Sequence, residues 1–310
     1  MTLSSPLRVA VVGVGYLGSR HAETYTKLPG ARLVAVCDQN RDRASHVAQT
    51  VGCEVVTKLS HLEGRVDAVS IAVPTSAHAE IGLFFLRRGI HVLMEKPLAT
   101  NLTQAHALLR EAMRHHCILQ VGHIERFNAA LLAAKRYLKA PRFVEVHRLS
   151  PYSFRGTDVS VVLDVMIHDL DLLLDLVRAP VTRVDAVGVS VLSPSEDLAN
   201  ARLVFASGCV ANLTASRVSD EPLRRFRVFQ EHAYLSIDTK EQLVTLAHLK
   251  GRTIERVHLP VNKRPPLEEE LASFLRAVSM RRTPVVSGED GRAALALAMR
   301  IEHALRQKRQ

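Results

Sequence analysis

The sequence lacks the segments that would attach it to a membrane or direct it out of the cell. Its 310 residues contain no apolar run close to the ~20 residues of a membrane-spanning helix. The first residues show no basic stretch followed by an apolar core, so we expect no signal peptide. Because 47% of the residues are hydrophobic, the chain can bury a large core. Its length indicates two domains, with one large domain as the alternative.

Cysteine is also scarce and shows no functional spacing. The four cysteines, Cys37, Cys53, Cys117 and Cys209, are far apart, and no two form a Cys-x-x-Cys pair. Three of them lie in or beside apolar runs that resemble strands. We therefore expect reduced, structural thiols in a cytoplasmic protein.

A formal charge of +10 raises the question of nucleic-acid binding. The basic residues are spread along the chain, with small clusters at residues 224–227 and 306–309. There is neither an aromatic-rich RNA platform nor a helix-turn-helix signature. A solvated basic surface, or one that steers a small anionic substrate, explains the charge better, and we expect no nucleic-acid partner.

A glycine-rich turn follows the first apolar run. Residues 7–12 read as a strand, the next six read Gly-Val-Gly-Tyr-Leu-Gly, and a helix is expected over residues 21–28. In this pattern Gly13 permits a tight turn, Gly15 lets the backbone approach a pyrophosphate, and Gly18 lets helix and strand pack closely. The strand before the motif and the helix after it favour a dinucleotide site that also includes Tyr16 and Leu17.

The residue expected to hold the adenosine ribose is Asp38. It ends the second strand-like run, residues 33–37, and lies 20 residues after Gly18. A carboxylate there accepts hydrogen bonds from the ribose hydroxyls and repels a 2′-phosphate, which favours NAD over NADP. Arg41 and Arg43 keep NADP open, because an arginine could hold the additional phosphate.

Strand and helix signals continue to alternate as far as Gly122. Strand-like runs occupy residues 66–73, 90–94 and 118–121, with helices at about residues 77–88, capped by Ser76, and from Thr100 or Asn101 to about residue 115. The alternation predicts a doubly wound parallel sheet of six strands, in which residues 90–94 form the fifth strand and residues 118–121 the sixth. Ligands bind at the carboxyl edge of such a sheet, and four polar residues are expected there: Thr75, His78, Glu95 and Lys96. A plain helix N-terminal role is the alternative for His78.

After Gly122 the pattern changes to successive strands. Residues 142–149, 182–191, 199–205, 209–215, 226–231, 233–237 and 244–249 read as strands with few helices between them. This predicts a largely antiparallel sheet. We expect α/β architecture, with a Rossmann domain over residues 1–122 and a second domain over residues 123–310. Two C-terminal helices, one beginning near Ser287, serve packing and could lie back on the first domain.

One helix in the second half is unusual. Residues 160–176 are apolar on nearly every side, and at about 100° per residue four polar residues fall within a stripe of roughly 60°. They are Asp164, His168, Asp171 and Asp175. The stripe favours a mostly buried helix lining a small polar space, and a thin solvated edge is the alternative. A metal site at Asp164 and His168 is conceivable, but no third ligand is evident and we expect none.

Together these motifs resemble the Gfo/Idh/MocA oxidoreductases. The matching segments are residues 13–18, Val-Pro-Thr at 73–75, Glu-Lys-Pro at 95–97, Asp-x-x-x-His at 164–168 and residues 287–291, in this order. The resemblance implies a Rossmann domain, a C-terminal substrate-binding and oligomerisation domain with an open antiparallel sheet over residues 123–310, and oligomers that often pair those sheets. It also implies that Lys96 and His168 face the nicotinamide, with Asp164 beside the substrate.

Within the family, residues 121–128 and 154–164 resemble the subgroup that acts on UDP-N-acetylglucosamine. The Gly-Gly that many family members carry shortly before the aspartate is missing here. The subgroup resemblance implies oxidation of the 3-hydroxyl to a 3-keto sugar, with an aminotransferase as functional partner in lipid A synthesis and a homo-oligomer, dimer or tetramer. Dehydrogenation of a free sugar or inositol is one alternative, and a non-catalytic dinucleotide sensor is another.

The resemblance and the chemistry of the side chains suggest roles for the site residues. A base must reach the hydroxyl proton and titrate near the working pH, which favours His168 for proton transfer. Lys96 would then bond the reacting oxygen, and the reverse assignment is the alternative. Asp164 would orient the sugar or the histidine. Arg155, just before the active helix, is the best substrate contact, and Arg217, Arg225 and Arg227 are weaker ones.

Overall fold

The computed structural model describes residues 5–153 and 159–307. The chain divides into two compact units, each with its own sheet. The first unit comprises Met1–Ile124 and Pro265–Arg292, and the second comprises Glu125–Arg264 and Ala293–Gln310. Among the described residues, no helix combines the length and apolar character needed to cross a membrane.

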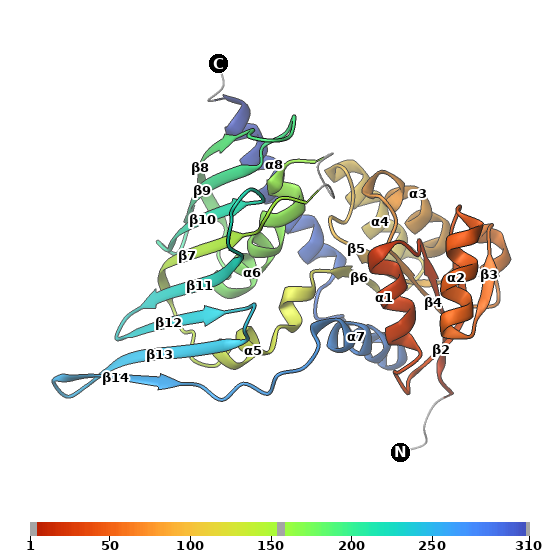
Figure 1. The fold of residues 1–310 in the computed structure, drawn as a ribbon, viewed down its shortest axis with the longest axis horizontal. Helices are drawn as coiled ribbons and strands as arrows, with labels where there is room; N and C mark the ends of the chain where they lie inside the picture. The colour runs from red at the N-terminus through yellow and green to blue at the C-terminus, as the bar shows by residue number, and fades with distance from the viewer. Residues whose placement is uncertain (1–4, 154–158, 308–310) are drawn as a thin grey trace. The chain divides into compact units, whose positions relative to one another are not determined.

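The first unit is built on a parallel sheet of six strands in the order β3-β2-β1-β4-β5-β6 (Figure 1). The order reverses between β1 and β4, as in a doubly wound sheet, so the expected fold class is confirmed. The third strand is the short β3, which no apolar run announced. The strands are β1 Leu7–Val12, β2 Ala31–Cys37, β3 Glu54–Val56, β4 Ala68–Ile71, β5 His91–Glu95 and β6 Leu119–Gly122.

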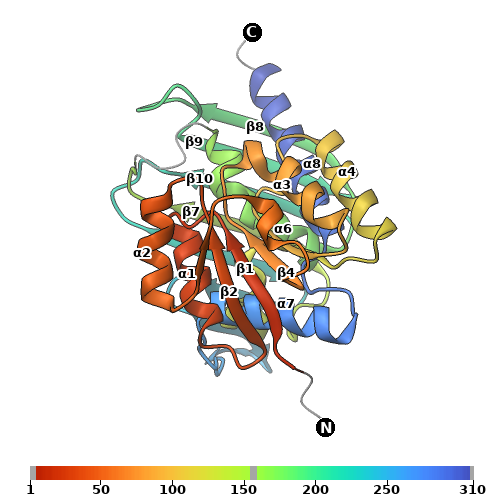
Figure 2. The same ribbon diagram turned by 90° about the vertical axis from the view of Figure 1, so that its right-hand side faces the viewer.

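Helices cover both faces of this sheet. One apolar cluster joins β1 and β2 to α1, α2 and α7, while α3 and α4 contact each other and β5. In Figure 2, α1 and α2 lie to the left of β1, and α3 and α4 lie to its right. The helices are α1 Tyr16–Tyr25, α2 Arg41–Val51, α3 Thr75–Leu86, α4 Leu102–Arg114 and α7 Pro266–Met280, with a 3₁₀ turn at Leu59–Leu62.

Local side chains determine where these helices begin. The side chain of Asn101 accepts a hydrogen bond from the backbone N–H of Gln104 and caps α4, as expected. The same arrangement at Asn40 caps α2. The expected cap at Ser76 is wrong: α3 begins two residues earlier than expected, at Thr75, directly after Pro74 and without a side-chain cap. Proline presets the backbone for a helix start, so a capping hydroxyl is not required there.

The second unit contains an eight-stranded sheet in the order β14-β13-β12-β11-β7-β10-β9-β8. All neighbouring strands are antiparallel except β7 and β10, which are parallel, so the expectation of a largely antiparallel sheet is confirmed. The strands are β7 Pro141–Leu149, β8 Val181–Val189, β9 Leu198–Phe205, β10 Val210–Ser216, β11 Leu223–Gln230, β12 Ala233–Asp238, β13 Leu243–Lys250 and β14 Thr253–His258.

One face of this sheet forms the core of the second unit. Alternate residues of the strands, such as Val144, Leu213 and Phe226, pack against helical residues such as Leu170 and Ile301. The opposite face has no helix among the described residues and carries a mixture of polar pairs and exposed apolar side chains. The helices are a 3₁₀ turn Ile124–Phe127, α5 Ala129–Lys135, a π-helix Val162–Met166, α6 Ile167–Val177 and α8 Gly288–Gln307.

Candidate active site

The glycine-rich turn has the geometry of a dinucleotide loop. Gly13 has φ +82° and donates its N–H to the carbonyl of Cys37. A Cβ at Gly18 would lie 1.8 Å from the carbonyl oxygen of Gly13, so no larger residue fits there. A Cβ at Gly15 would meet nothing within 4 Å, which leaves the backbone of the turn open to a ligand. Each glycine therefore has the role that its position predicts, and the loop fits a pyrophosphate at the start of α1.

Asp38 ends β2 beside this loop and is held from three directions. Its carboxylate accepts hydrogen bonds from the N–H groups of Val14 and Asn40, at 2.9 and 2.8 Å, and forms a 2.8 Å ion pair with Arg43. Burial alone would raise the pKa of Asp38, but the hydrogen bonds from Arg43, Val14 and Asn40 outweigh it and lower that pKa. The group is thus a fixed carboxylate, as a ribose contact requires.

The loops after β4 and β5 are joined by His78. Its Nδ1 lies 2.9 Å from the carbonyl oxygen of Pro97, and its Nε2 lies 3.0 Å from that of Val73. The side chain is buried, and this burial lowers the pKa of His78 against the opposing effect of the two carbonyls. His78 therefore links the Val-Pro-Thr and Glu-Lys-Pro loops. Its direct contact with the cofactor stays a prediction, as does that of Thr75.

Lys96 follows β5 at the carboxyl edge of the sheet. Its side chain is partly buried, and its backbone N–H donates to Oε2 of Glu95 at 3.3 Å. The buried Glu95 pairs across the sheet with Gly122 of β6. A Cβ on Gly122 would lie 2.8 Å from that carboxylate, so the space for Glu95 exists because residue 122 is glycine.

In the second unit, Asp164 lies in the π-helix and His168 in the first turn of α6, both partly buried. The wider turn of a π-helix breaks the 100° spacing from which the polar stripe was predicted. The helix is mostly buried, as expected. The polar space is, however, filled at one end: Arg126 forms ion pairs of 2.6 and 3.0 Å with Asp171 and Asp175.

The arginines proposed as substrate contacts have different positions. Arg155 lies outside the described residues. Arg217 is buried and paired with Asp197 at 2.8 Å, so its guanidinium stabilises the second unit. Arg225 pairs with Asp238 and Arg227 with Glu145, at 3.0 and 2.8 Å. The three weaker candidates are therefore already engaged in ion pairs within their own unit.

Sequence reasoning missed two buried polar residues next to Glu95. His21 of α1 and Glu270 of α7 lie with Glu95 in one cluster, whose ligand-type atoms are within 4.8 Å of one another. Among the described residues, this is the group of three that could hold a metal ion, whereas Asp164 and His168 belong to no such group. No role could be assigned to either residue from the sequence, because the cluster forms only when α1, β5 and α7 come together.

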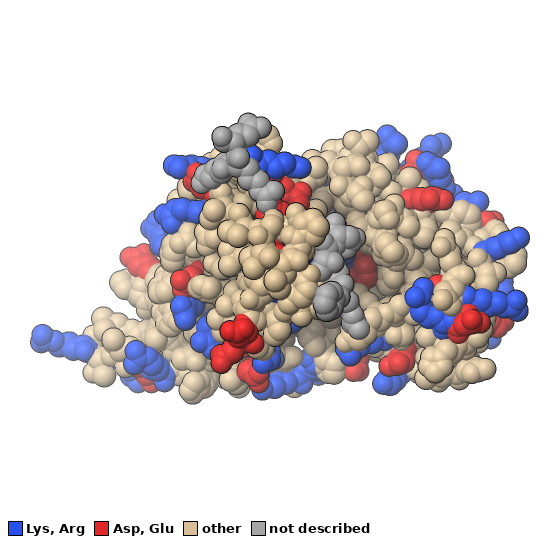
Figure 3. Space-filling view, turned by 45° about the horizontal axis from the view of Figure 1, so that its top comes forward, with Lys and Arg blue, Asp and Glu red and all other residues tan. Residues whose placement is uncertain are grey.

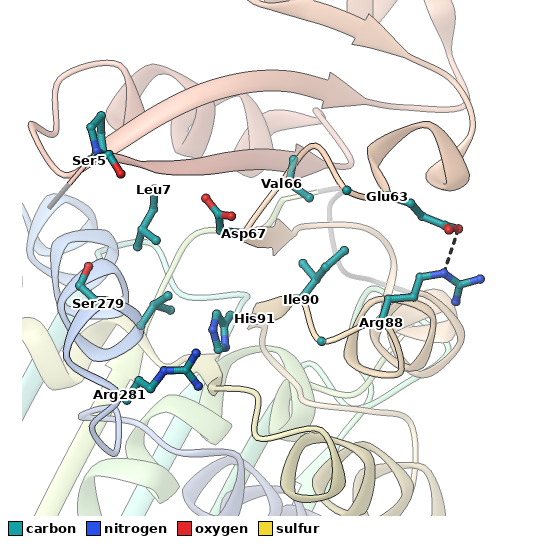
Figure 4. A pocket seen from close by; sticks show the side chains of 14 residues that line it. Ser5, Leu7, Glu63, Val66, Asp67, Arg88, Ile90, His91, Ser279 and Arg281 are labelled. Atoms are coloured by element: carbon teal, nitrogen blue, oxygen red, sulfur yellow. Dashed lines mark hydrogen bonds and ion pairs between the residues drawn. The ribbon is translucent and has the colours of Figure 1, made fainter.

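A pocket of about 800 Å³ lies at the opposite edge of the parallel sheet (Figure 4). It is lined by the amino ends of β1, β4 and β5, including Leu7, Asp67 and His91. Its charged groups are largely paired, as in the 2.8 Å contact of Arg88 with Glu63. Because a doubly wound sheet binds dinucleotides at its carboxyl edge, this pocket is not the cofactor site.

Comparison with known proteins identifies the family. Residues 7–123 match the oxidoreductase family with an NAD-binding Rossmann fold, and residues 137–236 match the GFO/IDH/MocA C-terminal domain. The chain is 36% identical to UDP-N-acetylglucosamine 3-dehydrogenase of Acidithiobacillus ferrooxidans, over 96% of this chain and 97% of that one. The chain belongs to the Gfo/Idh/MocA family. The family resemblance read from the motifs is thus confirmed, as is NAD as the cofactor.

Solved structures support the same relationship within the Gfo/Idh/MocA family. The structure of the Acidithiobacillus ferrooxidans enzyme superimposes with a TM-score of 0.94 and covers 99% of this chain and 100% of its own. Myo-inositol 2-dehydrogenase of Thermotoga maritima is 28% identical over 98% of this chain and 97% of its own. The chain is therefore an NAD-dependent oxidoreductase whose relatives include dehydrogenases named for a nucleotide sugar and for inositol.

Proposed function

We propose that this enzyme oxidises the 3-hydroxyl of UDP-N-acetylglucosamine to a ketone. The supporting observation is the similarity to the dehydrogenase of that name, which is 36% identical across nearly the whole of both chains. The inositol dehydrogenase at similar coverage is only 28% identical. Bound NAD supplies the acceptor for the hydride that leaves the sugar carbon. The remaining requirement is removal of the hydroxyl proton, which falls to the side chains of this chain.

The proposed roles rest on the family resemblance together with side-chain chemistry. Lys96, on the loop after β5, donates a hydrogen bond to the reacting oxygen and stabilises the negative charge that develops there. His168 accepts the hydroxyl proton, and Asp164 orients the sugar or the imidazole. Arg155 contacts the substrate. The dinucleotide loop binds the pyrophosphate of NAD, and Asp38 binds its adenosine ribose.

The test is a spectrophotometric assay of NADH formation with UDP-N-acetylglucosamine, free N-acetylglucosamine and myo-inositol. We expect turnover with the nucleotide sugar. Lys96→Ala and His168→Ala should each abolish NADH formation while NAD binding is largely retained. The exposed Lys58→Ala and His303→Ala variants are matched controls and should keep full activity. Full activity of Lys96→Ala or His168→Ala would refute the assigned roles.

Oxidation of inositol or a free sugar is the second candidate, because the myo-inositol 2-dehydrogenase is similar over the full length. The substrate panel separates the two candidates directly. Turnover of myo-inositol or of the free sugar, with none of the nucleotide sugar, would replace the first proposal by the second.

We further propose that the keto product is passed to an aminotransferase for lipid A synthesis, and that the enzyme is a cytoplasmic homo-oligomer. The second sheet supports oligomerisation, because its helix-free face exposes apolar side chains including Val187, Val189 and Phe229. Light scattering on the purified protein would measure the subunit number, and a monomer would contradict this part of the proposal.

We propose no nucleic-acid partner. Lys and Arg on the face seen in Figure 3 are scattered among Asp and Glu, so that face has no extended basic surface for nucleic acid.

A further inference from the structure

The buried cluster of His21, Glu95 and Glu270 lies wholly within the first unit. His21 and Glu270 are fully buried, and Glu95 is 7% exposed. The residues come from three elements far apart in sequence: α1 just after the dinucleotide loop, the carboxyl end of β5, and α7. Charged groups are buried only where something pairs with them, so the cluster requires an explanation.

The hydrogen bonding within the cluster is incomplete without additional protons. Nε2 of His21 lies 3.2 Å from Oε1 of Glu95. Within the described chain, neither ring nitrogen of His21 nor either carboxyl oxygen of Glu270 has a partner in hydrogen-bonding geometry. Two carboxylates offer only acceptors, and a neutral imidazole offers a single donor. Two ionised glutamates would therefore repel each other with too few donors between them.

One proton on Glu270 resolves this shortage. A neutral Glu270 can donate, the imidazole can donate and accept, and a single negative charge remains on Glu95. The groups that face Glu270 are Glu95, His21 and the Tyr25 hydroxyl, while the Gln120 amide donates to its backbone carbonyl. Burial, and then the charge of Glu95, raise the pKa of Glu270 well above its ordinary value.

A divalent cation is the competing occupant. It would need four or more ligands, and this group supplies three. The 3.2 Å between His21 and Glu95 is already a direct contact. A proton on Glu270 gives the same ring nitrogens and carboxyl oxygens a partner without the further ligands that a cation would need.

The cluster contacts the predicted catalytic loop through Glu95. Oε2 of Glu95 accepts the backbone N–H of Lys96, and the carboxylate lies over Gly122, where a Cβ would displace it. We propose that His21 and a protonated Glu270 are positioning residues that hold Glu95, and through it the Lys96 loop, in the arrangement needed for reaction. This rests on the proposed role of Lys96 in the oxidation.

The experiment compares Glu270→Gln, Glu270→Met and the control Glu111→Gln, a buried glutamate of α4 paired with Arg87 and His115. Glutamine mimics the neutral acid, so kcat should change by no more than about threefold. Methionine removes the donor, and kcat should fall about ten- to hundredfold, with KM for NAD nearly unchanged. The control should leave both constants unchanged.

Two further readouts do not depend on the substrate. Because a raised carboxyl pKa makes the folded state bind the additional proton, wild-type thermal stability should fall as pH rises above the unfolded-state pKa. Glu270→Gln should remove that fall, so its melting temperature should exceed the wild-type value increasingly towards pH 8. Elemental analysis of the purified protein should find no stoichiometric metal.

Each contrary result would overturn the proposal. A loss of kcat in Glu270→Gln as large as in Glu270→Met would show that the carboxylate charge is required. Unchanged kcat in Glu270→Met would restrict the cluster to packing. A bound metal that is lost in Glu270→Gln would replace the proton by a cation. If the wild type oxidises another substrate, kcat is measured with that substrate. The proposed substrate and the proposed role of the cluster can therefore be refuted independently.

Discussion

Arg43 and the adenosine ribose of NAD would compete for the carboxylate of Asp38. In the structure Arg43 occupies the carboxylate that the ribose hydroxyls of NAD would use. Its side chain is 50% exposed, whereas that of Asp38 is 6% exposed. The arginine is therefore the member that can turn away. An ion pair with one exposed partner contributes at most about 1 kcal/mol, so displacing it weakens NAD binding by no more than about fivefold.

Two substitutions with opposite effects test this competition. Asp38→Ala removes at least one hydrogen bond to a charged acceptor, worth about 1.5–3 kcal/mol, so the Kd for NAD should rise at least about 10- to 150-fold. Arg43→Ala removes the competitor, and the Kd for NAD should fall by up to about fivefold. The same variant loses a cation that could hold a 2′-phosphate, so the Kd for NADP should rise.

Isothermal titration calorimetry with NAD and NADP measures both effects. Arg41→Ala is the matched control for NAD binding, because it removes the same charge from the first turn of α2 without a bond to Asp38. Circular dichroism should confirm that Asp38→Ala is folded, since Val14 loses its acceptor in that variant. Weaker NAD binding by Arg43→Ala would refute the competition and make Arg43 part of the NAD site.

Three other substitutions have defined outcomes. Asp197→Asn should lower the free energy of unfolding at pH 7 by about 3 kcal/mol, measured with urea, because it removes the negative charge that pairs with the buried Arg217 guanidinium. Burial would raise the pKa of Asp197, but bonds from Ser193 and Arg217 outweigh it, so the stability it contributes is present above the unfolded-state pKa and should be lost as pH falls. Gly122→Ala should lower kcat, since its Cβ would lie 2.8 Å from Glu95; normal kcat would mean that the carboxylate can move freely. Asn101→Ala should cost about 1 kcal/mol in urea unfolding through loss of the α4 cap, and an unchanged midpoint would contradict this.

The parallel sheet could be predicted because its strands are nearly continuous apolar runs between turn signals. The dinucleotide loop was equally clear, since only glycine tolerates the backbone of residue 13 and the contact at residue 18. The strands β3 and β14 gave no such signal. Three residues are too few to show a period, and β14 is largely exposed, so neither strand needed an apolar pattern.

The polar stripe shows a different limit. A helical projection assumes 3.6 residues per turn, and nothing in residues 162–166 announces a π-helix. The projection also cannot show that Arg126, on another element, pairs with Asp171 and Asp175. The sequence thus identified a buried helix with unusual acids. It could not distinguish acids that face a ligand from acids neutralised by a distant arginine.

The cluster of His21 and Glu270 could be seen neither from an apolar pattern nor from a helical projection. A periodic pattern predicts that a position is buried, but not which polar groups share that burial, because the sharing depends on contacts between α1, β5 and α7. Burying these polar groups costs free energy, which suggests that the arrangement does something that an apolar core would not. The contact of Glu95 with the backbone of Lys96 supplies such a reason. A carboxylate held by an imidazole and an acid can keep the loop of Lys96 in a single position, which leucine at residues 21 and 270 could not do.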